Sequence, residues 1–214
     1  MMSNKSKRSQ QLDPRVKRTR QLLRKALIEL IPEKGYNAIT IQDITDRATL
    51  NRATFYLHYR DKDDLLNTGF DQIWDELTAQ NPLPVAPDGT LSIEGTRITV
   101  QMDFEHLAKN FEFYRVMLSK PGVAQFIHRM KDHVYTATAK RLEAVLGELP
   151  SGPVPIQIVL EFIASAYVGI IQWWLEEDMP YPPQEMASLI VSLYNMSPFQ
   201  AMGVLSSSES LELP

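Results

Sequence analysis

Residues 39–66 constrain the fold of this chain most, because two short helix signals follow each other there with almost no room between them. Thr40 is a candidate N-cap, and Asp43, three residues later, completes a capping box. Asn51 is a second candidate N-cap, and Leu50 before it is placed for a hydrophobic staple against Phe55. The stretch therefore predicts two short, separately capped helices joined by a turn.

Each of these two helices is predicted to bury one face. In the first, the residues expected to point inward are Ile41, Ile44 and Ala48, and those expected toward water or a partner are Gln42, Thr45, Asp46 and Arg47. In the second, Phe55 and Tyr59 share the inward face. The outward set is Ala53, Thr54 and Leu57, flanked by Arg52, Tyr56 and His58.

The outer face of the second helix has the chemistry of DNA recognition. A short helix fits the major groove, where Arg bonds guanine edges, Thr bonds bases and small apolar groups contact the thymine methyl. Tyr56, His58 and Lys62 suit phosphates instead. We therefore interpret residues 39–66 as a helix-turn-helix that reads DNA.

The same stretch resembles the N-terminal domain of the TetR family of bacterial repressors, within residues 15–66. The matching segments are Gly35–Tyr36, Thr40–Ile44, Arg47–Ala48, Thr54–Tyr59 and Lys62–Leu66. The resemblance implies that the residues facing DNA are Thr40, Gln42, Asn51, Arg52, Ala53, Thr54, Tyr56, Leu57, His58 and Lys62. It also implies that the helix starting near Lys62 joins the DNA-reading head to the body, with Lys62 bound to a DNA phosphate.

Thr49 departs from the family's pattern, which usually has Gly in this turn. If the position needs a positive φ, a β-branched side chain there costs roughly 1–2 kcal/mol. We therefore expect the turn to be rearranged.

The rest of the chain predicts an all-α protein of two parts. A helix runs from Pro14, capped by Asp13, to Gly35, and another from Asp61 to about Gln80. Residues 81–90 are rich in Pro and form a loop, and helices are expected at 91–109, 111–118, 121–147, 154–177 and 183–196. We divide the chain into a disordered basic tail (1–13), a DNA-binding domain (14–66), a helical regulatory and dimerisation domain (67–196) and a frayed tail (197–214).

Charge supports this division. Residues 1–62 contain 14 Lys or Arg and 6 Asp or Glu, a balance of +8, whereas residues 63–214 contain 8 and 20, a balance of −12. A basic end supplies salt-dependent affinity for phosphates, and an acidic end stays away from polyanions.

The helix near 154–177 is apolar on most faces and must be covered nearly all round. With only five helices in the body, we expect a second copy of the chain to cover it, forming a four-helix interface with the last helix. The interface residues expected are Ile158, Phe162, Ala166, Gly169, Ile170, Met186, Leu189, Ile190 and Leu193.

A small-molecule pocket in the body follows from the resemblance, lined by aromatic and sulfur-containing residues. The candidates are Phe104, Phe111, Tyr114, Met117, Phe126, Met130, Tyr167 and Trp173. His128 and His133 are five residues apart, so they do not share a helix face, and neither a metal site nor a cofactor is expected.

These patterns predict a homodimeric transcriptional regulator, a repressor that leaves a palindromic operator when a small molecule binds. An alternative is an adaptor or activator of the same fold whose body binds a protein. An enzyme is disfavoured, because no nucleophile, carboxylate pair or metal signature appears. The absence of cysteine, of a signal peptide and of an 18-residue apolar run favours the cytoplasm over a membrane.

Overall fold

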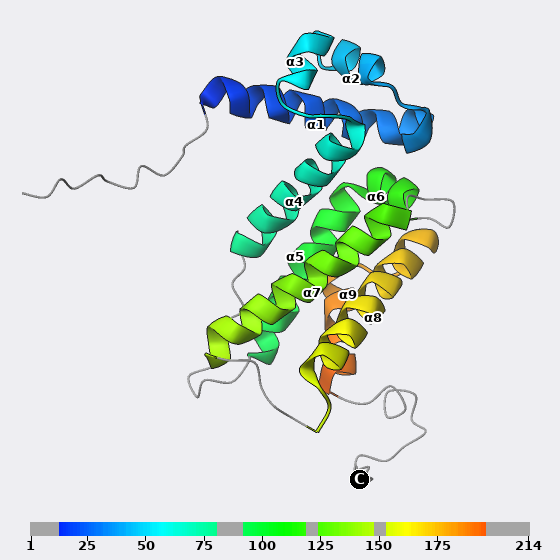
Figure 1. The fold of residues 1–214 in the computed structure, drawn as a ribbon. Coiled ribbons are helices and arrows are strands. Elements are labelled where there is room, and N and C mark those ends of the chain that lie inside the picture. Colours follow the sequence, from blue (N-terminus) through cyan, green and yellow to red (C-terminus); the bar gives the residue numbers. More distant parts are fainter. Residues whose placement is uncertain (1–12, 81–91, 119–123, 148–152, 196–214) are drawn as a thin grey trace, which may run out of the picture. The chain divides into compact units, whose positions relative to one another are not determined.

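The computed structural model describes residues 13–80, 92–118, 124–147 and 153–195 (Figure 1). All the regular elements within these ranges are helices, as the sequence predicts. The chain divides into two compact units, which we call the head (up to Phe70) and the body (from Asp71). The predicted tails at 1–13 and 197–214 and the loop at 81–90 lie outside the described residues, apart from Asp13.

The head consists of α1 (Pro14–Lys34), the short 3-10 helix η1 (Tyr36–Ala38), α2 (Ile41–Arg47), α3 (Arg52–Tyr56) and the first part of α4 (Lys62–Gln80). Helix α1 begins as predicted, because the Asp13 side chain accepts a hydrogen bond of 2.8 Å from the Arg15 amide and Pro14 occupies the first turn. It ends at Gly35, whose φ of 73° suits the absence of a side chain.

The core of the head is apolar and comes from all of its α-helices. Helix α1 supplies a buried stripe at helical spacing, α2 and α3 each supply one central side chain, and α4 closes the cluster. Its fully buried side chains include Leu23, Leu27, Ile31, Ile44, Phe55 and Leu65. Two short helices that could not persist alone are therefore held in place, with α2 packed on α1 and α3 packed on α2.

The body contains the rest of α4 together with α5 (Ile93–Lys109), α6 (Phe111–Leu118), α7 (Ala124–Leu146), α8 (Ile156–Glu176) and α9 (Pro183–Asn195). Each begins and ends within three residues of its predicted position. Helix α5 packs mainly on α9, and α7 lies beside α8 (Figure 1). An aromatic cluster joins α4, α5 and α6, in which Trp74 Nε1 donates to Tyr114 Oη at 3.0 Å and His106 Nε2 lies 2.9 Å from the same oxygen.

Helix α8 is long and apolar enough to cross a membrane by length and composition, a test that core helices of water-soluble proteins also pass. One face is buried in the body, through Leu160, Ala164, Tyr167, Ile171 and Trp174. The opposite face is exposed and still apolar, as described below.

Candidate functional sites

The two predicted N-caps start the two helices of the helix-turn-helix. Thr40 Oγ1 accepts from the Asp43 amide at 3.1 Å while the Asp43 carboxylate accepts from the Thr40 amide at 2.9 Å, which is the reciprocal capping box. A hydrogen bond from Lys34 is the largest cause of a lowered pKa at Asp43, and it ties the end of α1 to the start of α2. Asn51 Oδ1 accepts from the Thr54 amide at 2.7 Å and starts α3.

The turn between α2 and α3 keeps its shape despite Thr49. Thr49 has a φ of 57°, in the left-handed region, and the Leu50 amide still donates to the Thr45 carbonyl at 2.9 Å. Thr49 therefore adopts the positive φ considered above, in a region that a β-branched residue disfavours.

Helix α3 is anchored by one face and presents the other. Phe55 and Tyr59 are 0% and 3% exposed, and their ring centroids lie 5.9 Å apart. Arg52, Ala53, Tyr56 and Leu57 are exposed, and Leu57 has 81% of its surface accessible. An apolar residue so exposed on an anchored helix contributes nothing to the core, so this face is available for a partner.

The remaining predicted DNA-facing residues occupy three settings. Gln42 is exposed on α2 and donates to Asp46 at 2.7 Å. Thr40 and Asn51 are exposed caps, and the half-buried Thr54 donates its hydroxyl to Asn51 Oδ1 at 3.0 Å. His58 is half-buried, and burial lowers its pKa, with the Arg20 charge as a second cause.

One expectation for the head is corrected, and a second is refined. Thr45 does not face water: it is 0% exposed, and its hydroxyl donates to the backbone carbonyls of Ile41 and Gln42 at 3.0 Å. Arg47 is exposed, as expected, and its guanidinium also binds Glu33 of α1. In both cases the side chain bonds within the head, a contact that helical spacing alone does not reveal.

The Lys62 ammonium, which we expected to bind a DNA phosphate, is bound to backbone carbonyls of the head. Its ammonium donates to the carbonyls of Tyr36 (2.9 Å), Asn37 (3.1 Å) and Ile39 (3.0 Å), and lies 4.6 Å from the centre of the Tyr36 ring. An ammonium has three donors. A phosphate contact would have to replace one of these bonds, so Lys62 serves first to fix η1 onto the start of α4.

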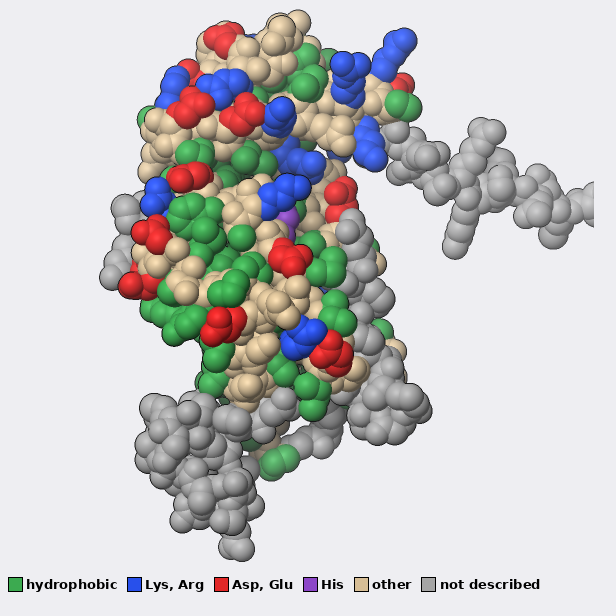
Figure 2. All heavy atoms as spheres, turned by 180° about the vertical axis from the view of Figure 1, so that it is seen from behind, with side chains coloured by type: hydrophobic (Ala, Val, Ile, Leu, Met, Phe, Trp, Pro, Cys, Tyr) green, Lys and Arg blue, Asp and Glu red, His purple; other side chains and the backbone are tan. Residues whose placement is uncertain are grey.

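Basic side chains flank the reading face. Arg15, Lys17 and Arg18 are exposed at the start of α1, and Figure 2 shows Lys and Arg side chains gathered in this region of the head. Such charges supply affinity for phosphates that does not depend on base sequence.

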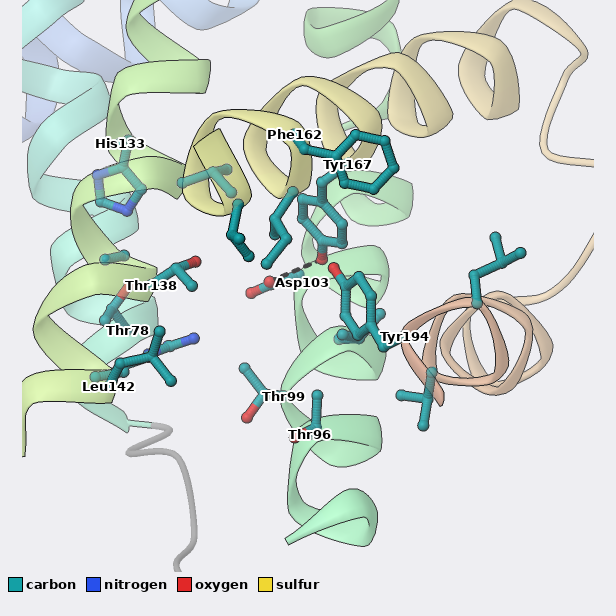
Figure 3. A pocket seen from close by; sticks show the side chains of 18 of the residues that line it. Thr78, Thr96, Thr99, Asp103, His133, Thr138, Leu142, Phe162, Tyr167 and Tyr194 are labelled. Carbon is teal, nitrogen blue, oxygen red and sulfur yellow. Dashed lines mark hydrogen bonds between the residues drawn. The ribbon is translucent and has the colours of Figure 1, made fainter. Parts of the chain in front are cut away.

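The body contains a cavity of about 510 Å³, lined by residues of α4, α5, α7, α8 and α9 (Figure 3). The exposed surface of its lining is mostly apolar, although nearly half of the lining residues carry polar groups. The polar and aromatic-hydroxyl residues of the lining are Thr78, Thr96, Thr99, Asp103, His133, Thr138, Arg141, Tyr167 and Tyr194. Pockets of this size and character bind small molecules.

Asp103 is the one carboxylate among the described residues that line the cavity. The Tyr167 hydroxyl donates to Asp103 at 2.9 Å, and the Tyr194 hydroxyl points toward the same place (Figure 3). Burial raises the pKa of Asp103 to about 6, although the Tyr167 bond and the Arg141 charge oppose the rise. Protein surrounds Asp103, yet part of its surface stays accessible because it borders the cavity.

Of the predicted ligand-binding residues, only Tyr167 lines this cavity. Phe104, Tyr114, Met117, Phe126 and Met130 are fully buried in the core. Phe111 is half-buried at the start of α6, and Trp173 is 44% exposed on α8. Aromatic content therefore indicates the buried core of the body and not the lining of the cavity.

The signal that points to the cavity is polar. Thr96, Thr99 and Asp103 recur at helical spacing on α5 beside the buried Val100 and Phe104. Among the described residues, no group of three or more metal-ligating side chains lies together.

The expected dimer face is partly exposed. On α8, an apolar stripe at helical spacing is accessible at Ile158, Phe162, Ala166 and Gly169, with Ile170 half-buried beside it. On α9, Leu189 and Leu193 are accessible, at 44% and 39%. Met186 and Ile190 are each 2% exposed, because that face of α9 packs within the body, so we remove both from the expected interface.

Comparison with known proteins gives two family matches. Residues 23–68 match the model described as "Bacterial regulatory proteins, tetR family", and residues 98–196 match "Transcriptional regulator C-terminal region" of the TetR type. The uncharacterized HTH-type transcriptional regulator YxbF of Bacillus subtilis is 25% identical over 199 residues, covering 91% of this chain and 49% of that protein. The chain thus spans about half the length of this curated relative.

Solved structures share the fold at low identity. The dihydroxyacetone kinase operon activator DhaS is 18% identical with a TM-score of 0.62, over 88% of this chain and 98% of that one. The regulator FadR from Bacillus subtilis, in complex with stearoyl-CoA, is 16% identical with a TM-score of 0.58, over 81% and 96%.

The helical head with its anchored, outward-facing α3, together with these matches, defines a DNA-binding transcriptional regulator of the helix-turn-helix class. The chain belongs to the TetR family.

Proposed function

We propose that this regulator is a cytoplasmic, ligand-responsive repressor that binds a palindromic operator as a homodimer. The observation that carries the proposal is the pairing of an exposed reading face on α3 with a partly polar cavity in the other unit of the same chain. One unit has the chemistry to read DNA and the other has the chemistry to sense a small molecule.

The homodimer is supported by the stripe on α8. Gly169 is exposed, and a Cβ added there would meet no atom of the described residues within 4 Å, so nothing in that part of the chain requires glycine. Small residues at 166 and 169 between Ile158 and Phe162 on one side and Trp173 on the other suit close approach of a second helix. A two-fold dimer would present two copies of α3 to successive major grooves, about 34–36 Å apart.

Ligand response requires only modest coupling, on the order of 1–3 kcal/mol between the two binding events. FadR, which shares the fold, is described in complex with stearoyl-CoA. That ligand belongs to FadR; the shared fold supports a ligand-binding body here and leaves the ligand's chemistry to the lining of this cavity.

A second candidate function is an activator or adaptor on the same fold. The observation in its favour is that DhaS, a neighbour in fold, is described as an operon activator. In that case the body would bind a protein, a partner would co-purify, and small molecules would leave DNA affinity unchanged.

The proposal is tested by titrating the purified protein onto its selected duplex, with and without small molecules that bind the cavity. We expect binding of one dimer per palindrome and at least a fivefold weaker affinity when the cavity is filled. DNA affinity independent of cavity occupancy would favour the adaptor instead.

A further inference from the structure

We propose that the ligand of the body cavity is an apolar compound without an anionic group that carries hydroxyl or ammonium donors, and that these donors bind the polar face of α5 formed by Thr96, Thr99 and Asp103. The inference rests on the proposed function in one respect, the use of this cavity for an effector, and adds the chemical class of that effector.

The polar face of α5 offers acceptors. The Thr96 hydroxyl donates to the Ser92 carbonyl at 3.0 Å, and the Thr99 hydroxyl donates to the Gly95 carbonyl at 3.1 Å. With their protons used within the helix, both oxygens can only accept. A carboxylate at Asp103 also only accepts, so three consecutive groups on this face call for donors from a ligand.

The same holds across the cavity from α5. The Tyr167 hydroxyl gives its proton to Asp103, which leaves its oxygen as an acceptor as well. Figure 3 shows Thr96, Thr99 and Asp103 following one another along α5, with Tyr167 and Tyr194 opposite Asp103. Tyr167 donates one hydrogen bond to the Asp103 carboxylate, which has lone pairs for several. A polar group enclosed by protein is more stable when it has hydrogen-bond partners.

The spacing sets the dimensions of the ligand. Thr96, Thr99 and Asp103 stand at i, i+3 and i+7, so they share one face of α5 over about 10 Å of helix axis. The facing walls combine aliphatic side chains (Val134, Ala137, Leu142, Val159 and Ile163) with polar ones such as Thr138 and Arg141. A ligand with a donor at Asp103, an apolar body against these walls and room for a second donor near Thr99 fits the 510 Å³ cavity.

Charge disfavours anionic ligands. Among the described residues of the lining, one carboxylate (Asp103) stands with one guanidinium (Arg141), and burial lowers the pKa of His133 and favours its neutral ring. The Arg141 charge already acts on Asp103. A ligand carboxylate or phosphate would therefore compete with Asp103 for that charge and be repelled by it.

The test compares four matched probes by calorimetry and by displacement of a fluorescent dye from the full chain: naphthalenemethanol, naphthalenemethylamine, the methyl ether of the alcohol, and naphthoate. We expect one or both donor probes to bind about tenfold or more tightly than the ether, and naphthoate to bind most weakly. The alcohol and amine arms distinguish the two sources of the donor.

Two cavity variants locate the interaction. Asp103→Leu should reduce the preference for the donor probes over the ether to within about threefold, while the ether still binds, which shows that the cavity is intact. Thr78→Val is the matched control, since it removes a hydroxyl of the lining that lies outside the proposed acceptor set, and it should keep the wild-type preference for the donor probes over the ether. Equal binding of alcohol and ether to the wild type, tightest binding of naphthoate, or binding of no probe would overturn the inference.

Failure of the proposed function has a different signature. If donor probes bind through Asp103 but DNA affinity stays constant, the ligand class stands and the ligand-responsive role fails. If ether or naphthoate releases DNA while the donor probes do not bind, the role stands and the ligand class is overturned.

Discussion

At the scale of single residues, Thr49 holds a backbone conformation that its side chain disfavours. Its φ is 57° at an exposed position. Replacing it with glycine should relieve the strain, and we expect Thr49→Gly to raise the free energy of unfolding by about 1 kcal/mol in urea denaturation. An unchanged or lower stability would mean that the Thr49 side chain makes compensating contacts.

A substitution of Lys62 distinguishes a structural role of this residue from a contact with DNA. Because its ammonium bonds three backbone carbonyls, Lys62→Met should lower the free energy of unfolding by about 1–2 kcal/mol while keeping the apolar stem. The salt dependence of DNA binding should keep its slope. A slope reduced by about one unit with unchanged stability would instead identify a phosphate contact.

Asp103 should make stability depend on pH. Its pKa rises from 3.8 to about 6 in the folded chain, so folding favours the protonated form, and stability falls as pH rises through that window. The groups facing it are Tyr167, Tyr194, Arg141 and Tyr114. Because Asp103 keeps surface accessible to the cavity, we expect a loss of about 1–2 kcal/mol.

The measurement for Asp103 is denaturation of the wild type and of Asp103→Asn across this pH window. The variant should be more stable than the wild type above the window, and the gap should close at low pH. Parallel curves would show that Asp103 does not titrate in this range.

At the scale of helices, the exposed stripe of α8 is open to a direct test. Gly169→Glu places a charge where a Cβ meets no atom of the described residues, so the monomer should fold with its helicity unchanged. We expect it to convert a dimer to a monomer in light scattering at micromolar concentration. Ala144→Glu, at an exposed position of α7, is the matched control and should leave the mass unchanged; a dimeric Gly169→Glu would place the interface elsewhere.

Helix positions were predictable from the sequence, because each is fixed by local signals. Asp13, Thr40 and Asn51 cap the helices that follow them, and the ends of α5 to α9 follow from apolar periodicity. The orientation of single side chains was less predictable. Thr45 turns inward because its hydroxyl is satisfied by the backbone, a possibility that polarity alone does not indicate.

The cavity was the feature hardest to foresee. Aromatic residues were the natural candidates for a pocket, yet side chains such as Phe104 and Tyr114 fill the space between helices completely. A cavity remains where smaller residues such as Thr99 and Ala137 line the helices. Which residues line a cavity depends on how the helices pack against one another, and the residue pattern of one helix does not specify that packing.

At the scale of the whole molecule, charge and chemistry are divided along the chain. Residues 1–62 carry +8 and the remainder −12, the α3 face lies in the head, and the cavity lies in the body. A repressor of the proposed kind needs this division, because the acidic body is kept from DNA while the head is drawn to it.

The central claim is that the outer face of α3 reads base sequence. The measurement is selection of bound duplexes from a random pool by the wild type, by Arg52→Ala/Thr54→Ala and by Arg15→Ala/Lys17→Ala, followed by salt titration. We expect the wild type to enrich a palindrome, the α3 variant to lose that enrichment while staying folded, and the α1 variant to keep the same palindrome with weaker affinity. Enrichment of the same palindrome by the α3 variant, or no enrichment by the folded wild type, would contradict the claim.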